Sequence, residues 1–125
     1  MRVLIVDDSS VMRKIVARSL QQAGLNIAQI LEAANGAEAL VVVRQEKVDL
    51  ILCDINMPVM DGLELVKQLS GVENAHKVPV VMITTEGSES HVVQALSAGA
   101  RGYIRKPFTP EHVREHVLPV LGKKS

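Results

Sequence analysis

Hydrophobic positions in this chain form short apolar runs that alternate with longer segments of helical period. The runs predict five strands and the longer segments predict a helix after each strand. The expected strands cover residues 2–6, 27–32, 49–53, 79–83 and 102–105, and the expected helices cover residues 9–23, 36–46, 62–70, 88–98 and 110–121. This alternation is typical of a doubly wound α/β fold, in which helices cover both faces of a parallel sheet.

The strands expected at 2–6, 49–53 and 79–83 are apolar almost throughout. A strand has this pattern when helices bury both of its faces, so we expect these three strands to be covered on both sides. No linker or low-complexity tract interrupts the pattern. We therefore expect one domain over residues 1–121, followed by a polar tail at 122–125.

Three glycines mark expected helix ends. Gly24, Gly71 and Gly99 each follow a segment of helical period. Glycine adopts the left-handed backbone conformation that commonly closes a helix, because it has no Cβ to clash with the preceding carbonyl. We expect that conformation at all three positions.

Composition excludes several classes of function. The 14 basic residues balance the 14 acidic ones, and aromatic residues make up only 2% of the chain. Such a chain has neither the positive field nor the stacking side chains of a nucleic-acid-binding protein. The apolar start at 1–6 is too short for a signal peptide or a membrane span, so we expect a cytoplasmic protein that does not insert into membranes. The lone Cys53 cannot form an internal disulfide and is expected to be a small buried side chain.

Polar residues stand where four of the apolar runs end. Asp7 and Asp8 end the first run, Asp54 the third, Thr84 the fourth and Lys106 the fifth. The carboxyl ends of parallel strands meet along one edge of a sheet, where ligands bind in α/β folds. These residues are therefore expected to converge on one pocket.

Three carboxylates in one pocket repel one another, and proteins tolerate this arrangement only with a compensating cation or with shifted pKa values. A hard divalent cation is the simpler of the two solutions. Mg²⁺ accepts about six oxygen ligands, among them carboxylates, backbone carbonyls, waters and phosphate oxygens. Asp8 and Asp54 are the expected direct ligands, Asp7 binds directly or through water, and the backbone carbonyl of Asn56 can complete the set. The sequence thus predicts Mg²⁺ as the cofactor.

Asp54 is the candidate nucleophile for a phosphoryl group. The first strand is followed by acids and serines instead of the glycines that cradle phosphate in nucleotide-binding loops, so phosphate can approach only with a cation present. Asp54 is the central carboxylate and is positioned for in-line attack on phosphorus. The Thr84 hydroxyl and the Lys106 ammonium are then expected to stabilise the phosphoryl oxygens.

This set of residues resembles the signature of the response-regulator receiver family, over nearly the whole chain. The matching residues are Asp7-Asp8, Asp54 within Asp54-Ile55-Asn56-Met57-Pro58-Val59-Met60-Asp61-Gly62, Thr84, and Lys106-Pro107-Phe108. Finer similarity to the single-domain chemotaxis members runs through Asp8-Ser9-Ser10-Val11-Met12-Arg13-Lys14, Asn56-Met57-Pro58, Met60-Asp61-Gly62-Leu63-Glu64-Leu65, and Tyr103.

The resemblance implies a flavodoxin-like sheet in strand order 2-1-3-4-5 and phosphorylation of Asp54 by a histidine kinase. It also implies a switch in which the Thr84 hydroxyl moves toward the phosphoryl group and Tyr103 swings inward. This movement would remodel the face made by the fourth helix, fifth strand and fifth helix. Asn56, Thr85 and Glu86 are implied as residues that tune the rate of dephosphorylation. Thr85 replaces the alanine usual in chemotaxis members, and we expect its bulk to slow phosphoryl entry or water attack.

The finer similarity implies a flagellar motor switch protein as the output partner, a phosphatase as a second partner, and a monomeric state. Two other fates remain open, namely transfer of the phosphoryl group along a relay and docking on a non-motor partner. Nor does the sequence decide whether the chain is a whole gene product or part of a longer regulator.

Two rival functions fit the residues less well than the switch. A phosphatase with an aspartate nucleophile generally needs a second Asp two residues later, where this chain has Asn56, so we expect slow self-dephosphorylation and no steady turnover. The run His112-Val113-Arg114-Glu115-His116 matches a zinc-protease pattern. A third ligand is not evident, and we expect a solvated helix face there.

Overall fold

Five parallel strands form one sheet with helices on both sides. The computed structural model of the protein describes residues 1–55, 60, 62–72, 77–84, 89–106 and 109–122. The elements are β1 (Arg2–Val6), α1 (Ser10–Gln22), β2 (Gln29–Ala33), α2 (Gly36–Gln45), β3 (Leu50–Asp54), α3 (Gly62–Leu69), β4 (Val80–Thr84), α4 (Glu89–Ala98), β5 (Gly102–Arg105) and α5 (Pro110–Gly122). The strand order is β2-β1-β3-β4-β5, which confirms the expected fold class.

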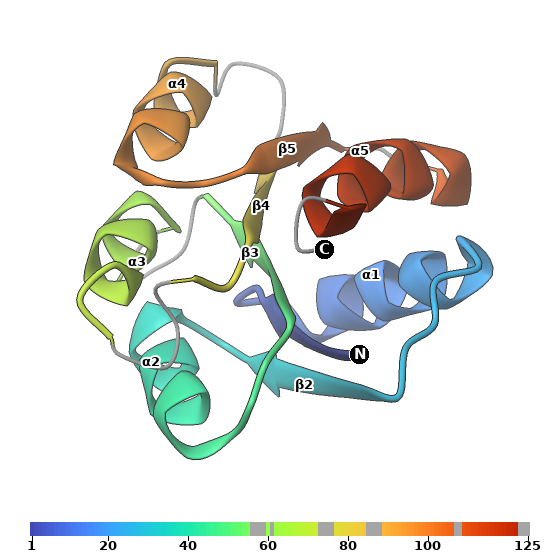
Figure 1. The fold of residues 1–125 in the computed structure, drawn as a ribbon, viewed down its shortest axis with the longest axis horizontal. Helices are drawn as coiled ribbons and strands as arrows, with labels where there is room; N and C mark the ends of the chain where they lie inside the picture. The colour runs from blue at the N-terminus through green and yellow to red at the C-terminus, as the bar shows by residue number, and fades with distance from the viewer. Residues whose placement is uncertain (56–59, 61, 73–76, 85–88, 107–108, 123–125) are drawn as a thin grey trace.

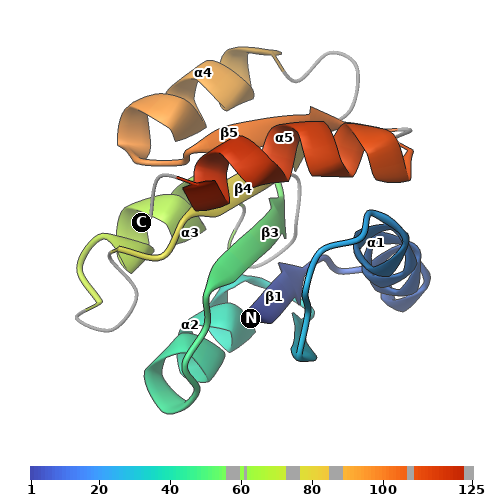
Figure 2. The same cartoon turned by 45° about the vertical axis from the view of Figure 1, so that its right-hand side comes forward.

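The helices divide into two groups around the sheet. Helices α1 and α5 cover one face, and α2, α3 and α4 cover the other (Figure 1). Turning the molecule shows α4 and α5 flanking the edge strand β5 (Figure 2). Within the described residues, none of the helices combines the length and the apolar character needed to cross a membrane.

Two hydrophobic clusters separate along the same division. The cluster beneath α2, α3 and α4 includes Leu4, Val6 and Leu65, whereas the cluster beneath α1 and α5 includes Ile5 and Val117. Alternate residues of β1 therefore point to opposite faces, as the pleat of a strand requires. The central strands β3 and β4 are buried at every residue, while β2 and β5 have exposed positions because they lie at the edges. The expectation of doubly covered central strands is confirmed.

All of the predicted elements are present, and the majority of their ends differ from the predicted bounds by one or two residues. Gly24 and Gly99 have positive φ angles of 79° and 127°, as expected of helix-ending glycines. The prediction for Gly71 is wrong, because its φ is not positive. After α3 the chain instead forms two tight backbone bonds, from the Gly71 and Val72 amides to the carbonyls of Gln68 and Leu69, and these turns satisfy the helix end without a left-handed residue.

Helix α1 begins at a capping serine that adjoins the predicted acidic pair. The Ser9 hydroxyl accepts a hydrogen bond from the Met12 amide at 3.2 Å, and the Ser9 backbone is extended, as is usual at an N-cap. At the other end of α1, the Arg114 guanidinium of α5 donates to the Ala23 carbonyl at 2.9 Å. A cation at a helix C-terminus meets unpaired carbonyls there, so this contact joins α1 to α5.

Candidate functional site

Four predicted site residues lie at the carboxyl edge of the sheet, at or just after the last residue of a strand. Asp54 ends β3 and Thr84 ends β4, while Asp7 follows β1 and Lys106 follows β5. The sheet ladder continues one step beyond β1 and β5, because the Asp7 amide donates to the Ala33 carbonyl at 3.1 Å and the Lys106 amide donates to the Thr84 carbonyl at 2.7 Å. Backbone pairing therefore fixes where these side chains emerge.

Three carboxylates gather at this edge, as the sequence predicted. One oxygen from each of Asp7, Asp8 and Asp54 lies within 4.8 Å of the others. The strands β1 and β3 that carry Asp7 and Asp54 are neighbours, with Val6 paired to Cys53 one residue earlier. Asp7 is 1% exposed and Asp54 is 8% exposed, whereas Asp8 faces solvent. The cluster is thus open on one side and buried on the other.

Lys106 contributes one positive charge to the cluster. Its Nζ lies 3.6 Å from Asp7 Oδ2 and 3.7 Å from Asp54 Oδ2, too far for short hydrogen bonds but close enough for ion pairs. Three carboxylates and one ammonium leave a formal charge of minus two at these four side chains. A divalent cation would neutralise that charge.

A buried oxygen of Asp7 gives an independent test of whether a cation fits. Asp7 Oδ1 accepts a hydrogen bond from the Ser9 amide at 2.9 Å. Asp7 Oδ2 is buried and has no hydrogen-bond partner within the described part of the chain. A buried carboxylate oxygen without a donor is costly unless a cation compensates it. The residues therefore fit a hard divalent ion such as Mg²⁺, with Asp7, Asp8 and Asp54 as its carboxylate ligands.

The two residues predicted to move in the switch differ in exposure. Thr84 is 4% exposed, and its position at the end of β4 places it beside β3, which carries Asp54. Tyr103 in β5 is 43% exposed, and its ring centroid lies 6.0 Å from that of His116 in α5. Asn56, Thr85 and Glu86 lie outside the described residues, so their predicted roles stay predictions.

Sequence reasoning missed three contacts that shape the site. The Ser9 amide orients Asp7, and the Arg13 guanidinium donates to the Asp7 carbonyl at 2.6 Å. Gly62 begins α3 directly against the end of β3, where a Cβ atom would come within 2.5 Å of the Asp54 carbonyl oxygen. Gly62 stood within the matched motif, and this close approach is the physical reason for a glycine there. The Arg13 contact has no signal in the sequence pattern.

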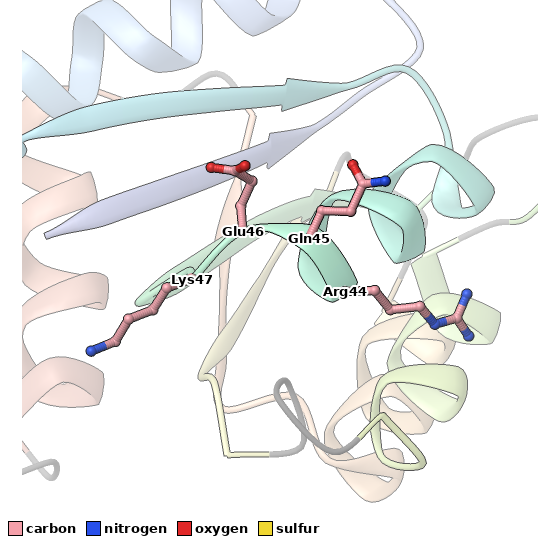
Figure 3. A pocket seen from close by; sticks show the side chains of 4 residues that line it. All are labelled: Arg44, Gln45, Glu46 and Lys47. Carbon is pink, nitrogen blue, oxygen red and sulfur yellow. The ribbon is translucent and has the colours of Figure 1, made fainter.

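A hollow on the surface, away from the acidic cluster, does not bring reactive side chains together. It is lined by Arg44, Gln45, Glu46 and Lys47, where α2 ends. In Figure 3 the Arg44 and Lys47 side chains point away from each other, so the two cations do not converge on one ligand. Glu46 turns toward the sheet and forms an ion pair with Arg2 at 2.5 Å. Of these two regions, the acidic cluster alone brings functional groups together.

Comparisons with known proteins relate the chain to one family. A family model described as the response regulator receiver domain matches residues 3–118. The chain is 43% identical over 126 residues to a chemotaxis protein CheY homolog of Campylobacter jejuni, covering 100% of this chain and 95% of the relative. It is 42% identical over 128 residues to chemotaxis protein CheY1 of Helicobacter pylori, covering 98% of each. The solved structure of chemotaxis protein CheY4 of Vibrio cholerae superposes with a TM-score of 0.85 at 38% identity, covering 96% of this chain and 98% of that one.

Proposed function

Because the chain belongs to the response regulator receiver domain family and is a phosphorylation-dependent signalling switch of the chemotaxis type, we propose that Asp54 accepts the phosphoryl group. The observation that carries this proposal is the cluster itself. Asp54 is the carboxylate at the end of the central strand β3, and it shares the Lys106 ammonium with Asp7. Its partial burial limits access to the open side of the cluster.

In the proposed reaction, a carboxylate oxygen of Asp54 attacks the phosphorus of a phosphohistidine on a histidine kinase. The new P–O bond forms as the P–N bond breaks, and the released imidazole takes a proton from solvent. Lys106 and Thr84 stabilise the phosphoryl oxygens by ion pairing and hydrogen bonding. When bound by Asp7, Asp8, Asp54 and the Asn56 carbonyl, Mg²⁺ supplies the positive charge that lets phosphate enter a carboxylate cluster.

The signal ends when water attacks the same phosphorus. The P–O bond to Asp54 breaks, releasing inorganic phosphate and restoring the carboxylate. Asn56, Thr85 and Glu86 are the proposed tuning residues for this step, and a separate phosphatase is a proposed partner. We expect this dephosphorylation to be slow, because these residues include no second aspartate that could act as acid and base.

The acceptor is tested by treating the protein with a small phosphodonor and Mg²⁺ and measuring intact mass. We expect the mass gain of one phosphoryl group in the wild type and in Asp49→Asn, and none in Asp54→Asn. Asp49 is a matched control because it stands just before β3, at the opposite end of the same strand. Phosphorylation of Asp54→Asn at wild-type stoichiometry would refute the assignment.

The proposed output is a change at the face formed by α4, β5 and α5, with Thr84 and Tyr103 as the moving side chains. Exposure of Tyr103 on this face supports that role. We propose a flagellar motor switch protein as the partner and a monomer as the free state. A relay protein or a non-motor partner is the alternative.

The partner is tested with the N-terminal peptide of the host's flagellar switch protein, with and without Mg²⁺ and beryllofluoride. Beryllofluoride on a carboxylate stands in for the phosphoryl group. We expect several-fold tighter binding with the mimic in the wild type and no gain in Asp54→Asn. Binding that ignores the mimic would exclude the motor role and leave the receiver chemistry intact.

A further inference from the structure

Arg13 connects the acidic cluster to the edge strand β2. It lies in the first turn of α1, and its side chain is only 16% exposed. The Nη1 atom donates to the Asp7 carbonyl oxygen at 2.6 Å, and the Nε atom pairs with Glu32 Oε1 at 2.7 Å. One guanidinium therefore spans β1, β2 and the start of α1.

The carbonyl that Arg13 holds belongs to the peptide between Asp7 and Asp8, two of the three clustered carboxylates. Two other groups of Asp7 are also held by hydrogen bonds. Its amide donates to Ala33, and its Oδ1 accepts from Ser9. Arg13 supplies the contact that fixes the plane of the following peptide, and that plane sets the direction in which the Asp8 side chain leaves the backbone.

We propose that Arg13 is a positioning residue for the metal site, orienting the Asp7 and Asp8 carboxylates through their shared peptide. The proposal rests on the Mg²⁺ site of the proposed function. It goes beyond that site by giving a positioning role to Arg13, which contacts none of the carboxylate oxygens expected to bind the metal. A charge-assisted bond at 2.6 Å is among the strong hydrogen bonds of proteins.

Glu32 completes the arrangement. A free guanidinium beside the cluster would repel a divalent cation, since like charges oppose each other over several ångströms. The ion pair with Glu32 neutralises this charge while leaving the hydrogen bond to the Asp7 carbonyl intact. Arg13 can then act as a hydrogen-bond donor at the site at little electrostatic cost to cation binding.

Arg2 is a matched control for Arg13, because it lies at the start of β1, whereas Arg13 contacts Asp7 just beyond the end of β1. Arg2 makes the same kind of forked contact, from Nε to Gln29 Oε1 at 3.0 Å and from Nη2 to Glu46 Oε1 at 2.5 Å. Arg2 starts β1, whereas the acidic pair follows the end of β1. Removal of either arginine deletes one cation and one ion pair, but of the two only Arg13 contacts the backbone of an expected metal ligand, Asp7.

The experiment compares Arg13→Met and Arg2→Met with the wild type by calorimetric titration of Mg²⁺ into the metal-free protein. We expect the Mg²⁺ dissociation constant of Arg13→Met to rise about tenfold or more, the usual effect of losing a residue that orients metal ligands. The constant for Arg2→Met should stay near the wild-type value. Amide exchange of Asp8 in the metal-free protein should accelerate in Arg13→Met alone.

A second pair of variants separates hydrogen bonding from charge. Arg13→Lys keeps the charge but cannot reach both partners, so we expect an intermediate dissociation constant. Glu32→Gln keeps an acceptor for Nε but leaves the guanidinium charge uncompensated. Mg²⁺ binding should therefore be weaker than in the wild type at low ionic strength, and this difference from the wild type should shrink as salt is added. Arg13→Lys also serves as the test if Arg13→Met does not fold.

The outcomes distinguish this proposal from the proposed function. Wild-type Mg²⁺ affinity in both Arg13→Met and Arg13→Lys, with a loss of stability like that of Arg2→Met, would show that Arg13 is structural and overturn the positioning role alone. Failure of the wild type to bind Mg²⁺ would overturn both proposals.

Discussion

At the scale of single residues, the ammonium of Lys106 and a bound cation should compensate the same negative charges. Lys106 Nζ stands between Asp7 and Asp54, within 3.7 Å of an oxygen of each. In the absence of Mg²⁺, Lys106→Met should lower the free energy of unfolding by about 1–3 kcal/mol, because the buried carboxylates lose their cationic partner. Chemical denaturation in metal-free buffer measures this loss.

Mg²⁺ should restore most of the stability lost in Lys106→Met and should therefore stabilise this variant more than it stabilises the wild type. Lys67→Met is the control, since Lys67 is an exposed lysine of α3. An equal gain from Mg²⁺ in all three proteins would mean that the lysine and the metal do not act on the same charges.

The contact between Tyr103 and His116 should limit solvent access to the tyrosine ring. Their ring planes are tilted by 40°, and the chain has one Tyr and no Trp, so intrinsic fluorescence reports Tyr103 alone. In His116→Ala we expect stronger quenching by a small soluble quencher, at a cost of about 0.5 kcal/mol in stability, because both rings are exposed. In the control His112→Ala, one turn earlier on α5, Tyr103 fluorescence should be quenched to the same extent as in the wild type. Equal quenching of Tyr103 in the two variants would contradict the prediction.

Residues of the candidate site were predictable from sequence to different extents. Asp7, Asp54 and Thr84 were placed correctly because each ends or follows an apolar strand, and parallel strands share one carboxyl edge. The Arg13 contact could not be predicted. It depends on the register that sets Glu32 opposite Ile5 across the sheet, and no local pattern encodes that register.

At the scale of elements, the start of α3 is fixed by its close approach to β3. The Gly62 amide donates to the Ile55 carbonyl at 2.9 Å, and an added Cβ would meet the backbone oxygen of Asp54. Gly62→Ala should lower the free energy of unfolding by about 1–3 kcal/mol, because backbone atoms cannot move aside as a flexible side chain would. Thermal denaturation measures the loss.

Gly71, just beyond α3, provides the matched control. Its nearest neighbour to an added Cβ is a carbonyl oxygen at 3.6 Å, an ordinary contact, and its φ is not positive. Gly71→Ala should change stability by no more than about 0.5 kcal/mol. Equal destabilisation by the two substitutions would show that the close approach at Gly62 is not what matters.

Helix and strand positions followed from apolar periodicity, whereas the way each helix ends did not. The sequence treats Gly24, Gly71 and Gly99 alike, yet only Gly24 and Gly99 adopt positive φ. The difference arises because backbone turns close α3 before a left-handed residue is needed. Edge strand β2 was predicted at 27–32 and lies at Gln29–Ala33, because its mixed polarity defines its ends poorly.

At the scale of the whole molecule, the thiol of Cys53 should report global opening. Cys53 is 0% exposed in the central strand β3, so a thiol reagent reaches it only when the sheet opens. If Mg²⁺ binds at the proposed site, it binds only the folded state, and a concentration about 100 times its dissociation constant should slow labelling about 100-fold when opening is fast relative to labelling. Labelling of Asp8→Asn should lose most of this Mg²⁺ dependence. Wild-type labelling that ignores Mg²⁺ would instead indicate local access to the thiol.

The sheet lies between the two hydrophobic clusters, so a substitution in one cluster should have little effect on which substitutions the other cluster tolerates. Volume lost beneath α2, α3 and α4 cannot be refilled from beneath α1 and α5, because the three central strands β1, β3 and β4 lie between the two clusters. Substitutions on opposite faces should therefore be nearly independent, whereas neighbours within one face constrain each other. A substitution that compensates for lost volume must arise on the same face as the original change. During evolution, core positions are therefore expected to co-vary within each cluster but not between the two clusters.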